Sequence, residues 1–201
     1  NPDYLFHLGA HTDLEYCEKN YLDTYNTNTL AVESAIQISN ELEIPLLYIS
    51  TAGIFGGEKE YFDDWDIPNP LSHYGRSKFA AENSVISNSN KYLVCRAGWM
   101  MGGGPRKDKK FINKLMYQIK NGSKELFIVD DKLGTPTYTH DFAKTVKAIL
   151  NNELWGLYNV VCTEITSRLE VAFELLKILN LDQIIKITPV KSDFWKNEYF
   201  A

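Results

Sequence analysis

Short apolar runs divide the first half of the chain into alternating strands and helices. The runs at 4–8, 46–50 and 92–95 predict buried strands, because continuous apolar stretches of this length fit strands covered on both faces. Helices are predicted between them over 29–43 and 74–85. This alternation is typical of an α/β fold, a doubly wound parallel sheet with helices on both faces.

Each of the two helices has its own sequence signal. Asn69-Pro70-Leu71-Ser72 predicts a turn, with Ser72 as the N-cap of the second helix. In the first helix, four apolar residues recur at helical spacing and predict a single stripe that packs on the sheet. These residues are Ala31, Ala35, Ile38 and Leu42.

The pattern changes beyond Arg96, where we expect a smaller α+β part. Ser167 and Glu170 form a capping-box pattern for a helix that reaches Leu179, and Thr139 is predicted to cap a helix that ends near Leu150. The remaining elements expected here are a loop at 102–105, a helix over 109–120, and strands over 126–129 and 157–161.

Composition and charge argue against nucleic-acid and membrane partners and favour a small molecule as the ligand. The 201 residues are 44% hydrophobic and 23% charged, which is typical of a globular protein. A net charge of -5 argues against a nucleic-acid partner. No apolar run approaches the ~20 residues of a membrane helix, so no membrane association is expected. Cys17, Cys95 and Cys162 lack disulfide or zinc spacing and are predicted to be buried free thiols in a cytoplasmic protein.

No metal site is expected either. The histidines His7, His11, His73 and His140 do not form the helical pair with an intervening glutamate that a zinc protease needs. The acidic segment 58–66 is interpreted as a solvated loop.

Tyr74 and Lys78 are the strongest candidates for chemistry. Four residues apart on a helix, their side chains lie on one face, and a lysine ammonium lowers the pKa of a nearby phenol toward the working range of an acid–base catalyst. About one such pair is expected by chance in this chain, so the context must add specificity. Thr51 and Gly9 follow the ends of two predicted parallel strands, where α/β sheets bind ligands, and Trp99 follows a third.

Four segments of the chain resemble the dTDP-4-dehydrorhamnose reductase family, a branch of the extended short-chain dehydrogenases. They are HLGAHTD (7–13), ISTAGIFGG (49–57), NPLSHYGRSK (69–78) and GTPTYTHDFA (134–143). The last two are the most specific, and the fourth separates this reductase branch from related sugar epimerases.

The resemblance implies NADPH or NADH as the cofactor and a nucleotide-sugar as the substrate. Tyr74 would give a proton to the reduced carbonyl, Lys78 would hold the nicotinamide ribose, and Thr51 would position the carbonyl. Gly9, Ala10 and His11 would lie along the cofactor. Ala52 and Trp99 would line the sugar site. The family commonly has an acidic residue at the position of Ala52 and a tyrosine at that of His11, so substrate preference and cofactor contacts are expected to differ.

The resemblance also implies a domain organisation. Residues 1–100 would be the remaining part of a Rossmann-like dinucleotide-binding domain, with the helix 139–150 packed on it, and 101–201 would mainly form the substrate-binding lid. The glycine fingerprint that cradles a pyrophosphate is absent before Tyr4, so we expect the first βα units to precede this chain. Arg106 belongs to a basic cluster that is a candidate for holding the substrate diphosphate. A homodimer is a further expectation.

Two alternatives to a reductase stay open. A sugar epimerase would use the same tyrosine and lysine, and the small residue Ala52 is common in epimerases. A dehydratase is disfavoured, because it would carry an Asp-Glu pair where Ala52-Gly53 stand. The third interpretation is a non-catalytic regulatory subunit, since relatives of the family regulate methionine adenosyltransferase.

Overall fold

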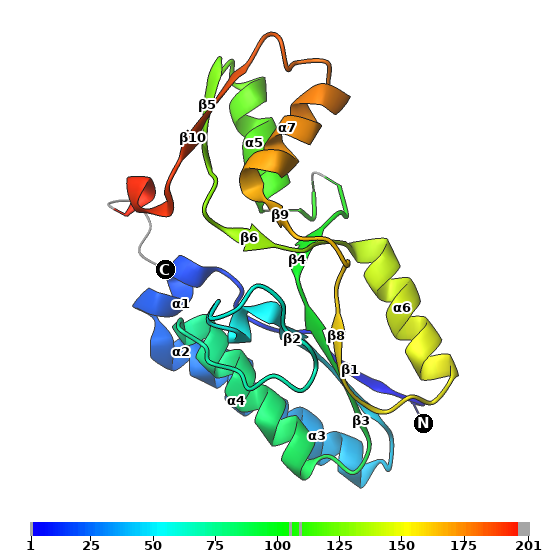
Figure 1. Ribbon diagram of the computed structural model, residues 1–201. Helices are drawn as coiled ribbons and strands as arrows, with labels where there is room; N and C mark the ends of the chain where they lie inside the picture. The colour runs from blue at the N-terminus through cyan, green and yellow to red at the C-terminus, as the bar shows by residue number, and fades with distance from the viewer. Residues whose placement is uncertain (1, 105, 109, 197–201) are drawn as a thin grey trace. The chain divides into compact units, whose positions relative to one another are not determined.

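A four-stranded parallel sheet forms the centre of the first part of the chain (Figure 1). In this computed structural model, which describes residues 2–104, 106–108 and 110–196, all neighbouring strands of this sheet pair in parallel. Their order is β1 (Leu5–His7), β2 (Leu46–Thr51), β3 (Tyr92–Ala97) and β8 (Gly156–Val160). The predicted α/β fold with a parallel sheet is confirmed.

Two long helices, α3 (Ala31–Glu41) and α4 (His73–Asn88), cover the sheet and bury the core with it. The N-cap predicted at Ser72 is confirmed, because its side chain accepts a hydrogen bond from the backbone N–H of Gly75. The buried residues shared by these helices and strands are Val32, Ala35, Ile36, Leu46, Tyr48, Ala81, Val85 and Val94.

The apolar stripe predicted for α3 is wrong except at Ala35. Val32 and Ile36 point into the core instead, while Ile38 and Leu42 are each 45% exposed. The preceding segment η1 (Asn26–Leu30) is a π-helical turn, which holds more residues per turn than an α-helix. The buried residues Val32, Ala35, Ile36 and Ser39 stand at i, i+3, i+4 and i+7, so they form a helical stripe of their own, and the prediction chose a neighbouring one.

Two short helices before η1 were not predicted from the sequence. α1 (Leu14–Lys19) begins after Asp13, whose carboxylate accepts a hydrogen bond from the Tyr16 N–H, and α2 (Tyr21–Tyr25) follows directly. Each is too short to show a clear helical repeat of apolar residues. Both contact α4, so they form part of the support of that helix.

The second part of the chain contains more strands than predicted. α5 (Phe111–Lys120) and α7 (Arg168–Ile178) pack with β5 (Glu125–Val129) around a small core, and the Ser167–Glu170 capping box is confirmed. Thr139 is not a cap but the first residue of α6 (Thr139–Asn151). The other elements are β4 (Trp99–Met101), β6 (Leu133–Gly134), β7 (Pro136–Tyr138), β9 (Thr166–Ser167), β10 (Lys186–Val190) and η3 (Ser192–Trp195).

The chain divides into two compact units. The first holds the residues up to Gly98 together with Phe142–Val160, and the second holds Trp99–Asp141 and the described residues after Val160. In the described ranges, no helix has the length and apolar character needed to cross a membrane. The prediction of buried thiols is correct for Cys17 and Cys95 but wrong for Cys162, which is exposed.

Candidate active site

Thr51 and Tyr74 meet where β2 ends and α4 begins. Thr51 is the last residue of β2, and its Oγ1 accepts a hydrogen bond from the Gly53 N–H at 3.1 Å, which starts the turn η2 (Ala52–Ile54). Tyr74 is the second residue of α4, and its hydroxyl is hydrogen-bonded to the Thr51 side chain. The structure therefore brings together two hydroxyl groups that the sequence placed on separate elements.

Two glycines allow this close approach of turn and helix. A Cβ added to Gly75 would lie 2.5 Å from the carbonyl oxygen of Gly53, a distance that real side chains do not show. A Cβ on Gly53 would lie 3.8 Å from Cε1 of Tyr74 and 3.3 Å from Oγ1 of Thr51. The phenol ring thus rests against a backbone without side chains, and its hydroxyl reaches Thr51.

The pKa of Tyr74 is raised above its usual 10.0, mainly because the phenol is buried, while the hydrogen bond with Thr51 opposes the shift. Lys78 is not among the groups that shift it, so the lowering predicted from the sequence is not found in this structure. A raised pKa keeps the phenol protonated at neutral pH. In the state described here Tyr74 therefore has a proton to donate, as an unshifted phenol would, and the proposed role as donor stays a prediction.

Lys78 lies one helical turn after Tyr74 and is buried, with 4% of its surface exposed. Its Nζ donates a hydrogen bond of 2.7 Å to the carbonyl of Ile49 and lies 4.1 Å from the centre of the Tyr48 ring. Burial lowers the pKa of Lys78 from 10.5 to about 7, although the negative charge of Glu82 opposes this shift. Near neutral pH the amine can therefore exist in both charge states.

Replacing Lys78 with Met is expected to change how stability depends on pH. With a pKa of about 7 in the folded chain and 10.5 as its ordinary value, the unfolded chain binds more protons between these pH values. Stability of the wild type relative to Lys78→Met should therefore rise from pH 7 to pH 10, by about 1.4 kcal/mol for each unit of pKa difference.

Urea unfolding at several pH values measures this difference. The matched control is Lys177→Met, because Lys177 is exposed on α7 and its pKa is raised rather than lowered. A stability difference between wild type and Lys78→Met that stays constant from pH 7 to 10 would refute the lowered pKa.

A buried ion pair joins α4 to β3, one helical turn after Lys78. Arg96 on β3 and Glu82 on α4 are 3% and 0% exposed, and Arg96 Nη2 is 2.6 Å from Glu82 Oε1. Ser50, the residue before Thr51, donates a hydrogen bond of 2.5 Å to Glu82 Oε2. These three side chains connect β2, β3 and α4 directly behind Thr51 and Lys78. Sequence reasoning missed them, although a charged residue inside the apolar run of β3 was a usable signal.

Arg96 also holds the acidic segment 58–66. Its Nη1 donates a hydrogen bond of 3.3 Å to the Asp64 carbonyl, and its guanidinium lies 5.2 Å from the centre of the Phe55 ring. The Asp64 carboxylate accepts a hydrogen bond from the backbone N–H of Asn159 on β8. Most of this segment is exposed, as predicted for a solvated loop, and Asp64 is the point at which it is fastened to the sheet.

The loop that follows β1 is tied to α4 by Asn28. This fully buried asparagine accepts a hydrogen bond from the His11 N–H at 2.7 Å and donates to the His11 carbonyl at 3.0 Å. Its amide also donates to Ser77 Oγ, which in turn donates to the carbonyl of Tyr74. The structure thus positions Gly9, Ala10 and His11 beside the start of α4. Asn28 was missed because its polar surroundings gave no helical pattern.

Trp99 and Arg106, the other predicted ligand-binding residues, belong to the second unit. Trp99 begins β4, and its indole lies so close to β6 that a Cβ on Gly134 would be 2.3 Å from Trp99 Cε2. Arg106 is exposed in a turn before α5. Their roles toward the substrate stay predictions.

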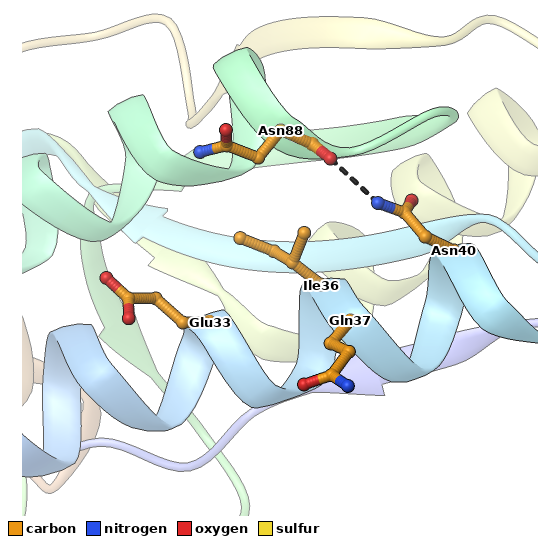
Figure 2. Close-up of a pocket in the computed structure, with 5 residues that line it drawn as sticks. All are labelled: Glu33, Ile36, Gln37, Asn40 and Asn88. Carbon is orange, nitrogen blue, oxygen red and sulfur yellow. Dashed lines mark hydrogen bonds between the residues drawn. The ribbon is translucent and has the colours of Figure 1, made fainter.

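A pocket of about 300 Å³ lies between α3 and α4, away from Thr51 and Tyr74 (Figure 2). Asn88 on its rim is about 21 Å along α4 from Tyr74, at 1.5 Å per residue. Across it the Asn40 side chain donates a hydrogen bond of 2.8 Å to the carbonyl of Asn88. This contact joins the ends of the two helices, and we assign the pocket no role in chemistry.

Within the described ranges, no three His, Cys, Asp or Glu side chains gather as a metal site would require.

A Tyr-x-x-x-Lys helix on a parallel sheet, with a threonine at the neighbouring strand end, defines the short-chain dehydrogenase/reductase class. Within this class, the chain belongs to the family described as RmlD substrate binding domain, whose model matches residues 1–197.

Curated relatives and solved structures agree with this assignment. The chain is 28% identical over 154 residues to dTDP-4-dehydrorhamnose reductase of Sinorhizobium fredii, covering 76% of this chain and 51% of the relative. It is 27% identical over 186 residues to spore coat polysaccharide biosynthesis protein SpsK of Bacillus subtilis, covering 92% of this chain and 64% of the relative. The chain thus spans about half to two thirds of these relatives.

Two crystal structures of dTDP-4-dehydrorhamnose reductases superpose on almost the whole chain. The protein from Yersinia enterocolitica is 36% identical with a TM-score of 0.89, covering 96% of this chain and 68% of that protein. The protein from Bacillus anthracis, solved in complex with NADP, is 28% identical with a TM-score of 0.90, covering 96% of this chain and 67% of that protein.

Proposed function

We propose that the complete protein reduces the C4 ketone of a nucleotide-linked deoxy-keto-sugar with NADPH or NADH. The observation that carries this proposal is the Tyr74 phenol, which is hydrogen-bonded to Thr51 at the end of β2 and stands one helical turn before Lys78. Such a hydroxyl pair suits a carbonyl oxygen that gains negative charge. The similar proteins named above as dTDP-4-dehydrorhamnose reductases support this reaction class.

The residues at the strand ends fit the nicotinamide half of such a cofactor. No atom lies within 4 Å of the place where a Cβ on Gly9 would be, so the backbone after β1 is open to a ligand. Lys78 uses one of its three N–H donors on the Ile49 carbonyl, and two remain for ribose hydroxyls. When bound, the cofactor supplies the hydride. The complex of the Bacillus anthracis protein with NADP supports this choice of cofactor.

The protein's own residues would supply the proton and hold the substrate carbonyl and the cofactor ribose in place. Tyr74 donates its proton to the carbonyl oxygen as negative charge develops there, and Thr51 holds that oxygen by a hydrogen bond. Lys78 fixes the ribose, while Ala52 and Trp99 line the sugar site. The dependence on a nicotinamide cofactor is consistent with a cytoplasmic location.

An epimerase of the same class is the second candidate, because Ala52 puts a small residue beside Thr51. The two reactions differ in redox balance: a reductase consumes one cofactor for each sugar converted, whereas an epimerase regenerates it. Purified complete protein is therefore mixed with dTDP-4-keto-6-deoxyhexose and NADPH, and the absorbance of NADPH is followed together with the sugar product. One NADPH lost per product supports the reductase, and conversion without loss supports the epimerase. No conversion at all would contradict both.

A further inference from the structure

Arg168 stands out in the second unit because its guanidinium lies against two aromatic rings. Its Cζ is 5.5 Å from the centre of the Trp99 ring and 5.7 Å from that of Phe111, both within the range of cation–π contacts. The indole is held in turn by its close contact with Gly134. Stacking uses the face of a guanidinium and leaves the N–H groups at its edge available for a ligand.

No acidic partner neutralises Arg168 in the part of the chain that the structure describes. The nearest carboxylate in sequence, Glu170, is already engaged: its Oε2 accepts hydrogen bonds from the Ser167 N–H at 2.7 Å and from Thr166 Oγ1 at 2.8 Å. Arg168 as a residue is exposed, yet the crowding of its guanidinium lowers its pKa, and no charge interaction opposes this shift. The buried guanidinium of Arg96, by contrast, forms an ion pair with the Glu82 carboxylate.

The same elements that hold Arg168 also line a pocket of about 310 Å³. Trp99 belongs to β4 and Phe111 to α5, and the pocket lies between β4, β7 and the first turns of α5. It is lined by Met101, Gly102, Gly104, Asp108, Ile112, Asn113, Met116 and Tyr138. Arg168 does not itself line this pocket and shares only the elements β4 and α5 with it.

The start of α5 adds a second feature that favours an anion. Its N-cap, Lys110, makes no side-chain cap hydrogen bond, so the first N–H groups of this ten-residue helix lack a side-chain acceptor. The Asp108 carboxylate accepts a hydrogen bond of 2.9 Å from the Lys110 N–H and occupies that donor only. Phe111, the first residue of the helix, is one of the two rings that contact Arg168.

We propose that Arg168 is a specificity residue that binds the diphosphate of the nucleotide-sugar through the N–H edge of its guanidinium. A planar guanidinium matches two oxygens of a phosphate, and the stacked rings fix its orientation before the ligand arrives. This proposal rests on the proposed function for the identity of the ligand. It assigns the anion-binding role to a residue that the sequence did not indicate, and it differs from the prediction for Arg106.

The test compares deoxythymidine diphosphate with thymidine as probes of the complete protein, by isothermal titration calorimetry. Arg168→Gln should weaken binding of the diphosphate roughly 10- to 100-fold, the worth of a charge-assisted hydrogen bond, and leave thymidine binding unchanged. Arg168→Lys should restore only part of the loss, since an ammonium cannot bind two oxygens in one plane. Lys177→Gln, which removes a cation from the exposed face of the same helix, should bind both probes like the wild type.

Three outcomes would overturn the proposal: a wild type that does not bind the diphosphate more tightly than thymidine, an Arg168→Gln variant that binds it normally, or an equal loss for both probes. Near-ultraviolet circular dichroism of the variant verifies that the fold is intact, so that a loss of binding reports the contact. The proposed function fails separately: a protein that binds the diphosphate through Arg168 but converts no keto-sugar would refute the reductase and support this site.

Discussion

Replacing Tyr74 with Phe in the complete protein is expected to lower turnover by a factor of about 10² to 10⁴, the usual contribution of a positioned acid. The reason lies in the geometry at the end of β2: the Tyr74 hydroxyl is hydrogen-bonded to Thr51, and Phe keeps the ring that packs on Gly53 but removes the proton. Initial rates of NADPH oxidation with the keto-sugar measure the effect. Cofactor affinity should change little.

Tyr117→Phe is the matched control for this substitution. Tyr117 is 68% exposed on α5, so the loss of its hydroxyl should leave turnover unchanged. If Tyr74→Phe retained near-normal turnover on the true substrate while binding it normally, the assignment of Tyr74 as the proton donor would be wrong.

Arg96→Met is expected to lower the free energy of unfolding by about 3–5 kcal/mol, because it leaves the carboxylate of Glu82 buried without its cation. Urea unfolding of variant and wild type measures the loss. The double variant Arg96→Met with Glu82→Leu should recover a large part of it, since an apolar pair of similar size needs no counter-charge.

Arg76→Met controls for the loss of a cation alone. Arg76 is exposed on α4 and donates a hydrogen bond of 3.3 Å to the Pro70 carbonyl, so its removal should cost less than about 1 kcal/mol. A cost for Arg96→Met no larger than that of Arg76→Met would show that Glu82 does not depend on this partner.

The elements that could be predicted from the sequence are those with local signals. Ser72 as N-cap, the capping box at Ser167 and the apolar runs of β2 and β3 depend on residues only a few positions apart. The relation of Thr51 to Tyr74 followed from parallel topology, because carboxyl ends of parallel strands share one edge of a sheet.

The features that were missed depend on contacts between distant segments. β10 pairs with β5 about 60 residues away, and nothing in its five residues marks the partner. Asn28 and Glu82 are polar residues whose burial is made favourable by partners on other elements, so their own surroundings in the sequence suggested solvent. In α3, two overlapping apolar stripes are present in the sequence, and only the packing against the sheet and α4 decides that Val32, Ala35 and Ile36 are the buried ones.

The guanidinium of Arg96 determines how the segment around Asp64 can open. A surface loop ordinarily exchanges its amide hydrogens, and is cut by proteases, through small local fluctuations. Here the carbonyl of Asp64 is bonded to Arg96, its carboxylate to the backbone of Asn159, and Phe55 stacks on Phe62 with ring centres 4.4 Å apart. The loop cannot detach without exposing two groups. One is the guanidinium of Arg96, which is paired with Glu82, and the other is the backbone of β8 at Asn159. We therefore expect amide hydrogens around Asp64 to exchange together with those of β3 and β8, and proteases to cut the loop only when the sheet opens.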